Sequence, residues 1–103
     1  MQTDDAVGRV LKAINAAGIT DKTLVIFASD NGCSMVADIS TLERQGHFPS
    51  GPYRGSKSDI WEGGHRVPLL VRWPNVVKPG STCTATVCLN SLLATCADIL
   101  GKS

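Results

Sequence analysis

The sequence of 103 residues has almost no excess charge of either sign. Ten Lys and Arg residues stand against nine Asp and Glu residues, so the formal net charge is +1. A protein that grips the phosphate backbone of a nucleic acid or an anionic membrane surface needs a strong positive field. We therefore predict no nucleic-acid partner and no electrostatic attachment to membranes.

Long apolar runs are also missing. The longest, such as 24–28 and 67–71, hold about five residues, whereas a membrane-spanning helix needs roughly 20. We predict no membrane span. The segment Met1–Asp5 is acidic where a signal peptide is basic, and no apolar segment follows it. The chain is therefore expected either to be cytoplasmic or to lack the start of the natural protein, and its localisation stays open.

Cysteine pairs at metal-binding spacing are absent. The four cysteines form no Cys-x-x-Cys pair and have no histidine at zinc-finger distance, which argues against a structural zinc site: Cys33, Cys83, Cys88 and Cys96. We expect them to be small buried thiols rather than disulfides. The 43% hydrophobic and 18% charged fractions are typical of globular proteins, so one small domain with some packed core is predicted.

The first half of the chain has the pattern of an α/β layer. Apolar residues recur at three- and four-residue steps over residues 3–18, which predicts an amphipathic helix that ends at Gly18. Residues 23–29 form an unbroken β-branched and aromatic run, typical of a strand covered on both faces in a parallel sheet. A helix that leads into such a strand indicates an α/β architecture.

The second half begins with a long segment without periodicity. Residues 30–66 hold six of the ten glycines, and a loop of that length in a compact domain is usually functional or disordered. We predict a strand over residues 67–73, a turn at Lys78–Ser81, and a second amphipathic helix over residues 90–100 that ends at Gly101.

Asp30 and Asn31 directly follow the first predicted strand. Ligands in α/β sheets bind beyond the carboxyl ends of strands, and carboxylate and amide oxygens suit Ca²⁺ or Mg²⁺. The alternative is a simple turn, because Asp, Asn and Gly32 are all turn formers. Two ligands do not complete a calcium shell, so a metal site would need oxygen donors from elsewhere.

The glycine-rich segment Gly51–Pro68 carries four basic side chains that could enclose a tetrahedral oxyanion: Arg54, Lys57, His65 and Arg66. Its glycine spacing before Lys57 does not fit a Walker loop. A solvated basic loop would have much the same composition, and both interpretations stand.

Three ordered blocks give a specific resemblance: Thr23–Gly32, then Arg54–Lys57, then Trp61–Pro68, which continues to Trp73-Pro74. Together with both predicted helices, they resemble the sulfatase family of the alkaline phosphatase superfamily over nearly the whole chain. The resemblance implies a fragment of an alkaline-phosphatase-like mixed or parallel sheet flanked by helices. Residues 1–103 would be one partial catalytic domain, from the later part of a much longer one.

The resemblance also implies roles for individual residues. Asp30 and Asn31 match the late pair of ligands for a divalent cation, usually Ca²⁺, and Lys57 matches a catalytic lysine that contacts the sulfate group. His65 and Arg66 belong to the Glu-Gly-Gly-x-Arg-x-Pro signature. For both we favour packing roles, with Arg66 as an ion-pair partner, and a place for His65 in the substrate pocket is the alternative. His47 receives no role.

The nucleophile that the resemblance implies is missing from the chain. Sulfatases use a formylglycine made from Cys or Ser in a Cys/Ser-x-Pro-x-Arg motif, and no cysteine here has that context. Ser50–Arg54 matches the serine version literally, but it stands too late in the chain and lacks the Leu-Thr-Gly continuation, so we interpret it as a chance match.

The expected partners are therefore a sulfate ester and the remainder of the catalytic domain, and the fragment alone should be inactive. By resemblance the full-length enzyme would be periplasmic or secreted. The alternatives are a related phosphoester or phosphonate hydrolase and a non-catalytic remnant or binding module.

Overall fold

The computed structural model describes residues 2–102, so Met1 and Ser103, the ends of the predicted domain, lie outside the described residues. Its elements follow one another in this order: helix α1 (Gln2–Ala16), 3-10 turn η1 (Thr20–Lys22), strand β1 (Val25–Ala28), 3-10 turn η2 (Met35–Ala37), helix α2 (Ile39–Arg44), helix α3 (Glu62–His65), strand β2 (Leu69–Arg72) and helix α4 (Ser91–Ile99). The α/β class is confirmed.

The two strands form an antiparallel pair, with Val25 opposite Arg72 and Ala28 opposite Leu69. An antiparallel pair is compatible with the mixed sheet among the expectations, although the apolar run of β1 is more typical of a parallel sheet. An unbroken apolar run indicates that both faces of a strand are suited to burial, but it does not fix the direction of the neighbouring strand. The long connection leaves β1 at its carboxyl end and enters β2 at the same end of the strand pair, so the two strands run in opposite directions.

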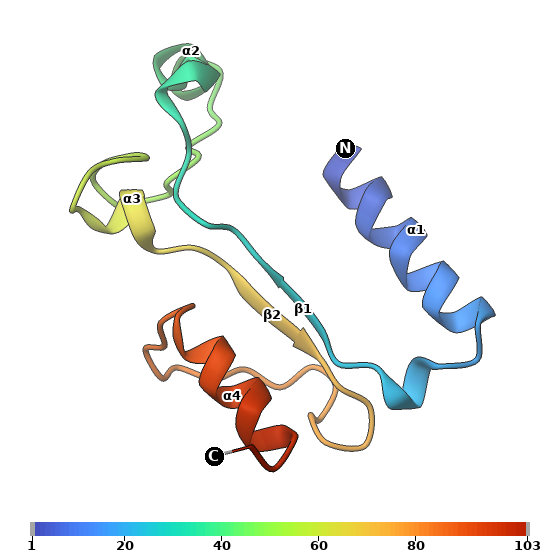
Figure 1. Cartoon of the computed structure of the whole chain (residues 1–103). Helices are drawn as coiled ribbons and strands as arrows, with labels where there is room; N and C mark the ends of the chain where they lie inside the picture. The colour runs from blue at the N-terminus through green and yellow to red at the C-terminus, as the bar shows by residue number, and fades with distance from the viewer. Residues whose placement is uncertain (1, 103) are drawn as a thin grey trace.

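Helices α1 and α4 stand on opposite sides of the strand pair, and the segment that carries α2 and α3 extends from one end of it (Figure 1). The predicted helix 3–18 is shorter in the structure because it ends at Ala16, and the predicted helix 90–100 spans Ser91–Ile99. The glycines expected to end them have φ of +68° at Gly18 and +64° at Gly101. Both predicted helices are confirmed to within two residues at each end.

The sequence indicated no regular elements in the long segment between the strands, but the structure contains several. It contains η2, α2 and α3, none longer than six residues, and such short helices leave no periodic pattern in a sequence. Asp38 precedes α2 with φ of 49°, and its carboxylate accepts a hydrogen bond from the amide of Thr41 at 3.3 Å. A side-chain cap therefore starts α2 within the predicted loop.

The described residues contain no buried hydrophobic side chain. The Cα radius of gyration is 16.5 Å, against roughly 13 Å for a compact domain of this length. Among the described elements only β1 and β2 pack closely on each other. The packed core predicted from composition is therefore absent between residues 2 and 102, because no helix packs closely on the strand pair there.

The prediction of buried thiols is wrong for three of the four cysteines. Cys83, Cys88 and Cys96 are exposed, and Cys33 is half-buried. These three thiols are exposed because the described part of the chain beyond β2 has no hydrophobic core to enclose them. All four thiols are free, as expected.

Between residues 2 and 102, no helix has both the length and the apolar character needed to cross a membrane.

Candidate functional site

The segment that follows β1 is joined to the two glycine-rich blocks by backbone hydrogen bonds. The amide of Gly32 donates to the carbonyl of Gly64 at 2.9 Å, and the amide of Lys57 donates to the carbonyl of Cys33 at 2.8 Å. The amide of Gly63 donates to a carbonyl of the middle block, at Arg54, also at 2.8 Å. The three blocks that are separate in the sequence therefore meet in space.

Glycine is required where these backbones meet. A Cβ placed on Gly32 would collide with the carbonyl oxygen of Gly63, and one on Gly63 would collide with the carbonyl oxygen of Gly55. A Cβ on Gly64 would collide with the carbonyl oxygen of Asp59. We call Gly32, Gly63 and Gly64 the glycine hub. Gly63 and Gly64 are buried, so the glycine-rich sequence serves close backbone approach here.

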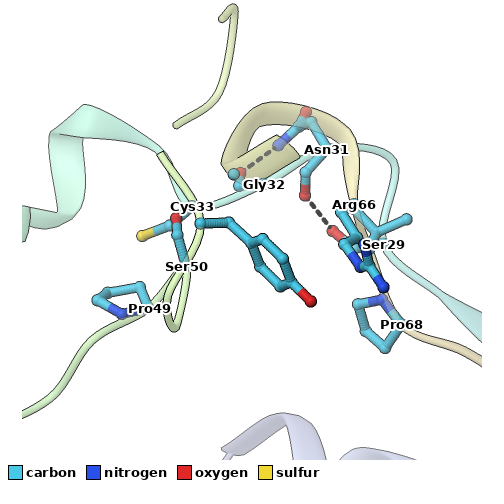
Figure 2. A pocket seen from close by; sticks show the side chains of 11 residues that line it. Ser29, Asn31, Gly32, Cys33, Pro49, Ser50, Arg66 and Pro68 are labelled. Carbon is cyan, nitrogen blue, oxygen red and sulfur yellow. Dashed lines mark hydrogen bonds between the residues drawn. The ribbon is translucent and has the colours of Figure 1, made fainter. Parts of the chain in front are cut away.

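Asp30 and Asn31 lie just beyond the carboxyl end of β1, as predicted. Asp30 is exposed and Asn31 is half-buried. The Asn31 amide nitrogen donates to the carbonyl of Gly32 at 2.9 Å, and the hydroxyl of Ser29 donates to the carbonyl of Asn31 at 2.7 Å (Figure 2). Since the amide nitrogen of Asn31 is engaged, the side-chain oxygen is the atom left to face a cation.

The donor set for a metal is partial. Within residues 2–102 no cluster of three or more His, Cys, Asp or Glu side chains is arranged to hold an ion. Asp30 and the oxygen of Asn31 are hard donors of the kind that Ca²⁺ prefers, but a calcium shell takes six to eight oxygens. The chemistry of the two residues suits a hard divalent cation, but two donors do not complete its shell.

Lys57 lies at the tip of a turn and is exposed. Its backbone is fixed to the segment after β1 through Cys33, while its ammonium makes no ion pair within 4.0 Å among the described residues. A lysine whose backbone is anchored and whose ammonium is unpaired is available to bind an anion. The structure thus joins the block of Lys57 to the segment that follows Asn31.

His65 and Arg66 are both exposed, and their described contacts are with Glu62 and Tyr53. Arg66 Nη1 lies 2.7 Å from Glu62 Oε2, and the guanidinium stacks on the ring of Tyr53 at 4.6 Å from its centroid. The hydrogen bond to Glu62 raises the pKa of Arg66 further above its ordinary value. His65 Nε2 lies 3.9 Å from Glu62 Oε1. The predicted ion pair of Arg66 is confirmed.

An open hollow of about 380 Å³ lies beside Asn31 (Figure 2). Its walls come from the segment after β1, from the turn around Ser50 and Tyr53, and from the backbone between Gly63 and Pro68. Of the candidate cation and oxyanion residues, Asn31 and Arg66 line it, whereas Asp30, Lys57 and His65 are not among its lining residues.

Ser50, in the literal Ser-x-Pro-x-Arg match, is half-buried, and its hydroxyl donates to the carbonyl of Gly55 at 3.0 Å. His47 is exposed and bonds through its backbone amide to the carbonyl of Leu42 at 2.9 Å. Its side chain still has no assigned role.

Sequence reasoning missed the contacts that shape the lysine turn. The carboxylate of Asp59 accepts a hydrogen bond from the amide of Ser56 at 2.8 Å, and the guanidinium of Arg54 stacks on Trp61 at 4.1 Å from the ring centroid. An acidic residue three positions after a serine has the spacing of a capping box, in which the acidic side chain accepts from the amide of the serine. The cation–π contact has no comparable local signal.

Comparison with known proteins gives a consistent result. The family model described as Sulfatase matches residues 1–102. The chain is 40% identical to mouse steryl-sulfatase over 100 residues, which is 97% of this chain and 16% of that protein. It is 39% identical to human arylsulfatase A over 101 residues, 98% of this chain and 18% of that protein.

A bacterial relative, N-acetylgalactosamine-6-O-sulfatase of Bacteroides thetaiotaomicron, is 39% identical over 82 residues, 77% of this chain and 16% of that protein. The chain therefore spans less than a fifth of the length of these relatives. No solved structure gives a significant match.

Proposed function

Because this chain belongs to the sulfatase family, we propose that it forms one part of the active site of a sulfuric ester hydrolase. The observation that carries the proposal is the junction at the glycine hub. Backbone hydrogen bonds of 2.9 Å and 2.8 Å fix the segment of Asp30 and Asn31 against the block that bears Lys57. Two hard oxygen donors and one cation are thereby held on neighbouring loops, a combination suited to a divalent cation and a sulfate group.

Asp30 and Asn31 would hold the divalent cation, for which we propose Ca²⁺. Bound there, the cation would polarise sulfate oxygens and neutralise charge. The hydrogen bond from the amide nitrogen of Asn31 to the carbonyl of Gly32 orients its side chain and leaves the oxygen available. The remaining oxygen ligands would come from the rest of the catalytic domain.

Lys57 would bind the sulfate group and stabilise the negative charge that develops as the S–O bond breaks. Such a charge is effective when its position is set before the reaction. The backbone bond from Lys57 to Cys33 fixes the point from which the lysine side chain extends. Because its ammonium has no ion-pair partner among the described residues, it need not leave a carboxylate to meet the sulfate.

His65 is a weaker part of the proposal. Contact of His65 with substrate would require it to turn from Glu62, 3.9 Å away. We retain the packing role as the first interpretation and substrate contact as the second.

The nucleophile would come from another part of the protein. None of the four cysteines is followed by Pro and Arg at the formylglycine spacing, and the hydroxyl of Ser50 is bonded to the carbonyl of Gly55. We propose that residues 1–103 are a partial catalytic domain, inactive alone, and that the full-length enzyme is periplasmic or secreted.

The test compares hydrolysis of an aryl sulfate and an aryl phosphate by the full-length protein that carries this segment. We expect the sulfate ester to be preferred and Lys57→Ala to lower kcat/KM by on the order of 10²- to 10³-fold. Lys78→Ala, which removes an exposed lysine in the turn before Gly80, is the matched control and should keep full activity. Preference for the phosphate ester would instead support a related phosphoester hydrolase, and no turnover of either ester would support a non-catalytic remnant.

A further inference from the structure

Lys57 occupies the first corner of a four-residue reverse turn. The turn runs from Ser56 to Asp59, and the amide of Asp59 donates to the carbonyl of Ser56 at 2.9 Å. Ser58, at the second corner, has φ of +78°, the value of a type II turn. In a turn of this kind the side chain at the first corner points away from the rest of the chain. Lys57 is therefore exposed, although hydrogen bonds hold Ser56 and Asp59 on either side of it.

The carboxylate of Asp59 closes the turn a second time. Its Oδ2 accepts a hydrogen bond from the amide of Ser56 at 2.8 Å and lies 3.4 Å from the hydroxyl of the same residue. Ser56 is the one polar side chain that is buried among the described residues, at 6% exposure. A charged acceptor makes a stronger hydrogen bond than a neutral one, so the start of the turn is held firmly.

The other side of Asp59 rests on the glycine hub. Its carbonyl oxygen lies where a Cβ on Gly64 would be, and Gly64 in turn accepts the hydrogen bond from Gly32. Asp59 therefore connects two things: the hub that carries the segment of Asn31, and the turn that carries Lys57. It makes no ion pair with Lys57 within 4.0 Å in the described part of the chain, so its effect on the lysine passes through the backbone.

We propose that Asp59 is a positioning residue for Lys57. Its carboxylate holds Ser56 so that the ammonium of Lys57 starts from a constant place relative to Asn31, without touching the substrate. The inference rests on the proposed role of Lys57 in sulfate ester hydrolysis. Asp59 is neither one of the basic residues considered for binding an oxyanion nor one of the two proposed cation ligands.

The first test is a double-mutant cycle in the full-length protein, with an aryl sulfate as substrate. We expect Asp59→Ala to lower kcat about tenfold with little change in KM, the effect of one charge-assisted hydrogen bond, and Asp59→Asn to recover most of it because the amide oxygen still accepts from Ser56. Asp21→Ala, an exposed aspartate in η1, is the control. In a background of Lys57→Ala, the further change Asp59→Ala should cost almost nothing, because it acts through the lysine. Full additivity of the two losses would overturn the proposal.

The second test reads the turn directly by amide hydrogen exchange in the same protein. Asp59→Ala should accelerate exchange at Ser56 and Lys57 about tenfold or more, while the amides of β1 keep their protection. Unchanged exchange at both amides would overturn the proposal, whatever the kinetics. If Lys57→Ala leaves turnover unchanged, the proposed function of Lys57 is wrong. Faster exchange at Ser56 and Lys57 in Asp59→Ala would then show only that Asp59 stabilises the turn.

Discussion

The amide of Gly32 donates a 2.9 Å hydrogen bond to the carbonyl of Gly64, and neither residue has room for a side chain. This contact joins residues 32 positions apart, and it brings the end of β1 to α3. A second backbone bond, from the amide of Lys57 to the carbonyl of Cys33 at 2.8 Å, fixes the block that bears the candidate sulfate lysine to the same segment.

Gly64→Ala should therefore destabilise the full-length protein by about 2–3 kcal/mol, because the new methyl group would meet the backbone of Asp59 and Ser56 rather than a flexible side chain. Urea unfolding measures the change. Gly8→Ala is the matched control: nothing lies within 4 Å of a Cβ there, and alanine is favoured in a helix, so a gain of roughly 0.5–1 kcal/mol is expected. Equal effects of both substitutions would contradict the close approach.

Ser58→Gly should stabilise the protein slightly. A left-handed conformation costs an L-residue about 1–2 kcal/mol, which glycine avoids, and the greater freedom of glycine in the unfolded chain returns part of that, which leaves a gain of about 0.5 kcal/mol. The positive φ of 78° makes this position suitable. Ala85→Gly, in an exposed segment without a positive φ, should instead lose stability in the same thermal melts.

The stability of the N-terminal cap of α2 should depend on pH through the carboxylate of Asp38. Hydrogen bonds from the side chains of Thr41 and Ser40 and from the amide of Thr41 hold the pKa of Asp38 below its ordinary value of 3.8. A lowered folded pKa means that the contribution to stability is complete above pH 3.8 and is lost as the pH falls through the lower folded value.

Amide exchange across Ile39–Arg44, corrected for the intrinsic exchange rate at each pH, measures the opening of α2 as a function of pH. In Asp38→Asn the cap acceptor and the tolerance of positive φ remain but the titrating group is gone, so its exchange should show no transition in that acid range. A transition that persists in Asp38→Asn would assign the effect to another carboxyl group.

Removal of a bound divalent cation should lower the stability of the full-length protein. If Asp30 and Asn31 supply two of its ligands, added Ca²⁺ at a hundred times its Kd raises the free energy of unfolding by about 2.7 kcal/mol, and a chelator reverses the gain. Asp30→Asn should weaken the calcium-dependent rise in melting temperature, whereas Asp21→Asn should leave it unchanged. A rise of equal size in both variants would remove Asp30 from the ligand set.

The local elements were largely predictable. The three- and four-residue spacing of apolar side chains found α1 and α4, and the glycines that end them, Gly18 and Gly101, have the expected positive φ. The strands were found within two residues of their bounds, but their pairing direction was not. Helices of four to six residues, such as α2 and α3, were missed because one turn of helix shows no period.

The candidate site was predictable only as separate pieces. The blocks around Asn31 and Lys57 and their order along the chain follow from the sequence, and the ion pair of Arg66 was expected. The turn between Ser56 and Asp59 is local and had a signal in the sequence, whereas the stacking of Arg66 on Tyr53 depends on how two separate segments approach each other. Burial was also mispredicted, since hydrophobic composition shows that side chains favour a core but not whether these residues can form one among themselves.

The sequence by itself determined the family, the type of each long element and the candidate residues for a cation or a sulfate group, because these properties depend on local pattern and residue chemistry. Only the tertiary structure decided that β1 and β2 run antiparallel, that the glycine hub joins the Asn31 and Lys57 segments, and that no apolar side chain between residues 2 and 102 is buried. These features depend on which backbones approach each other, and that is set by steric fit and hydrogen bonding between segments far apart in the chain.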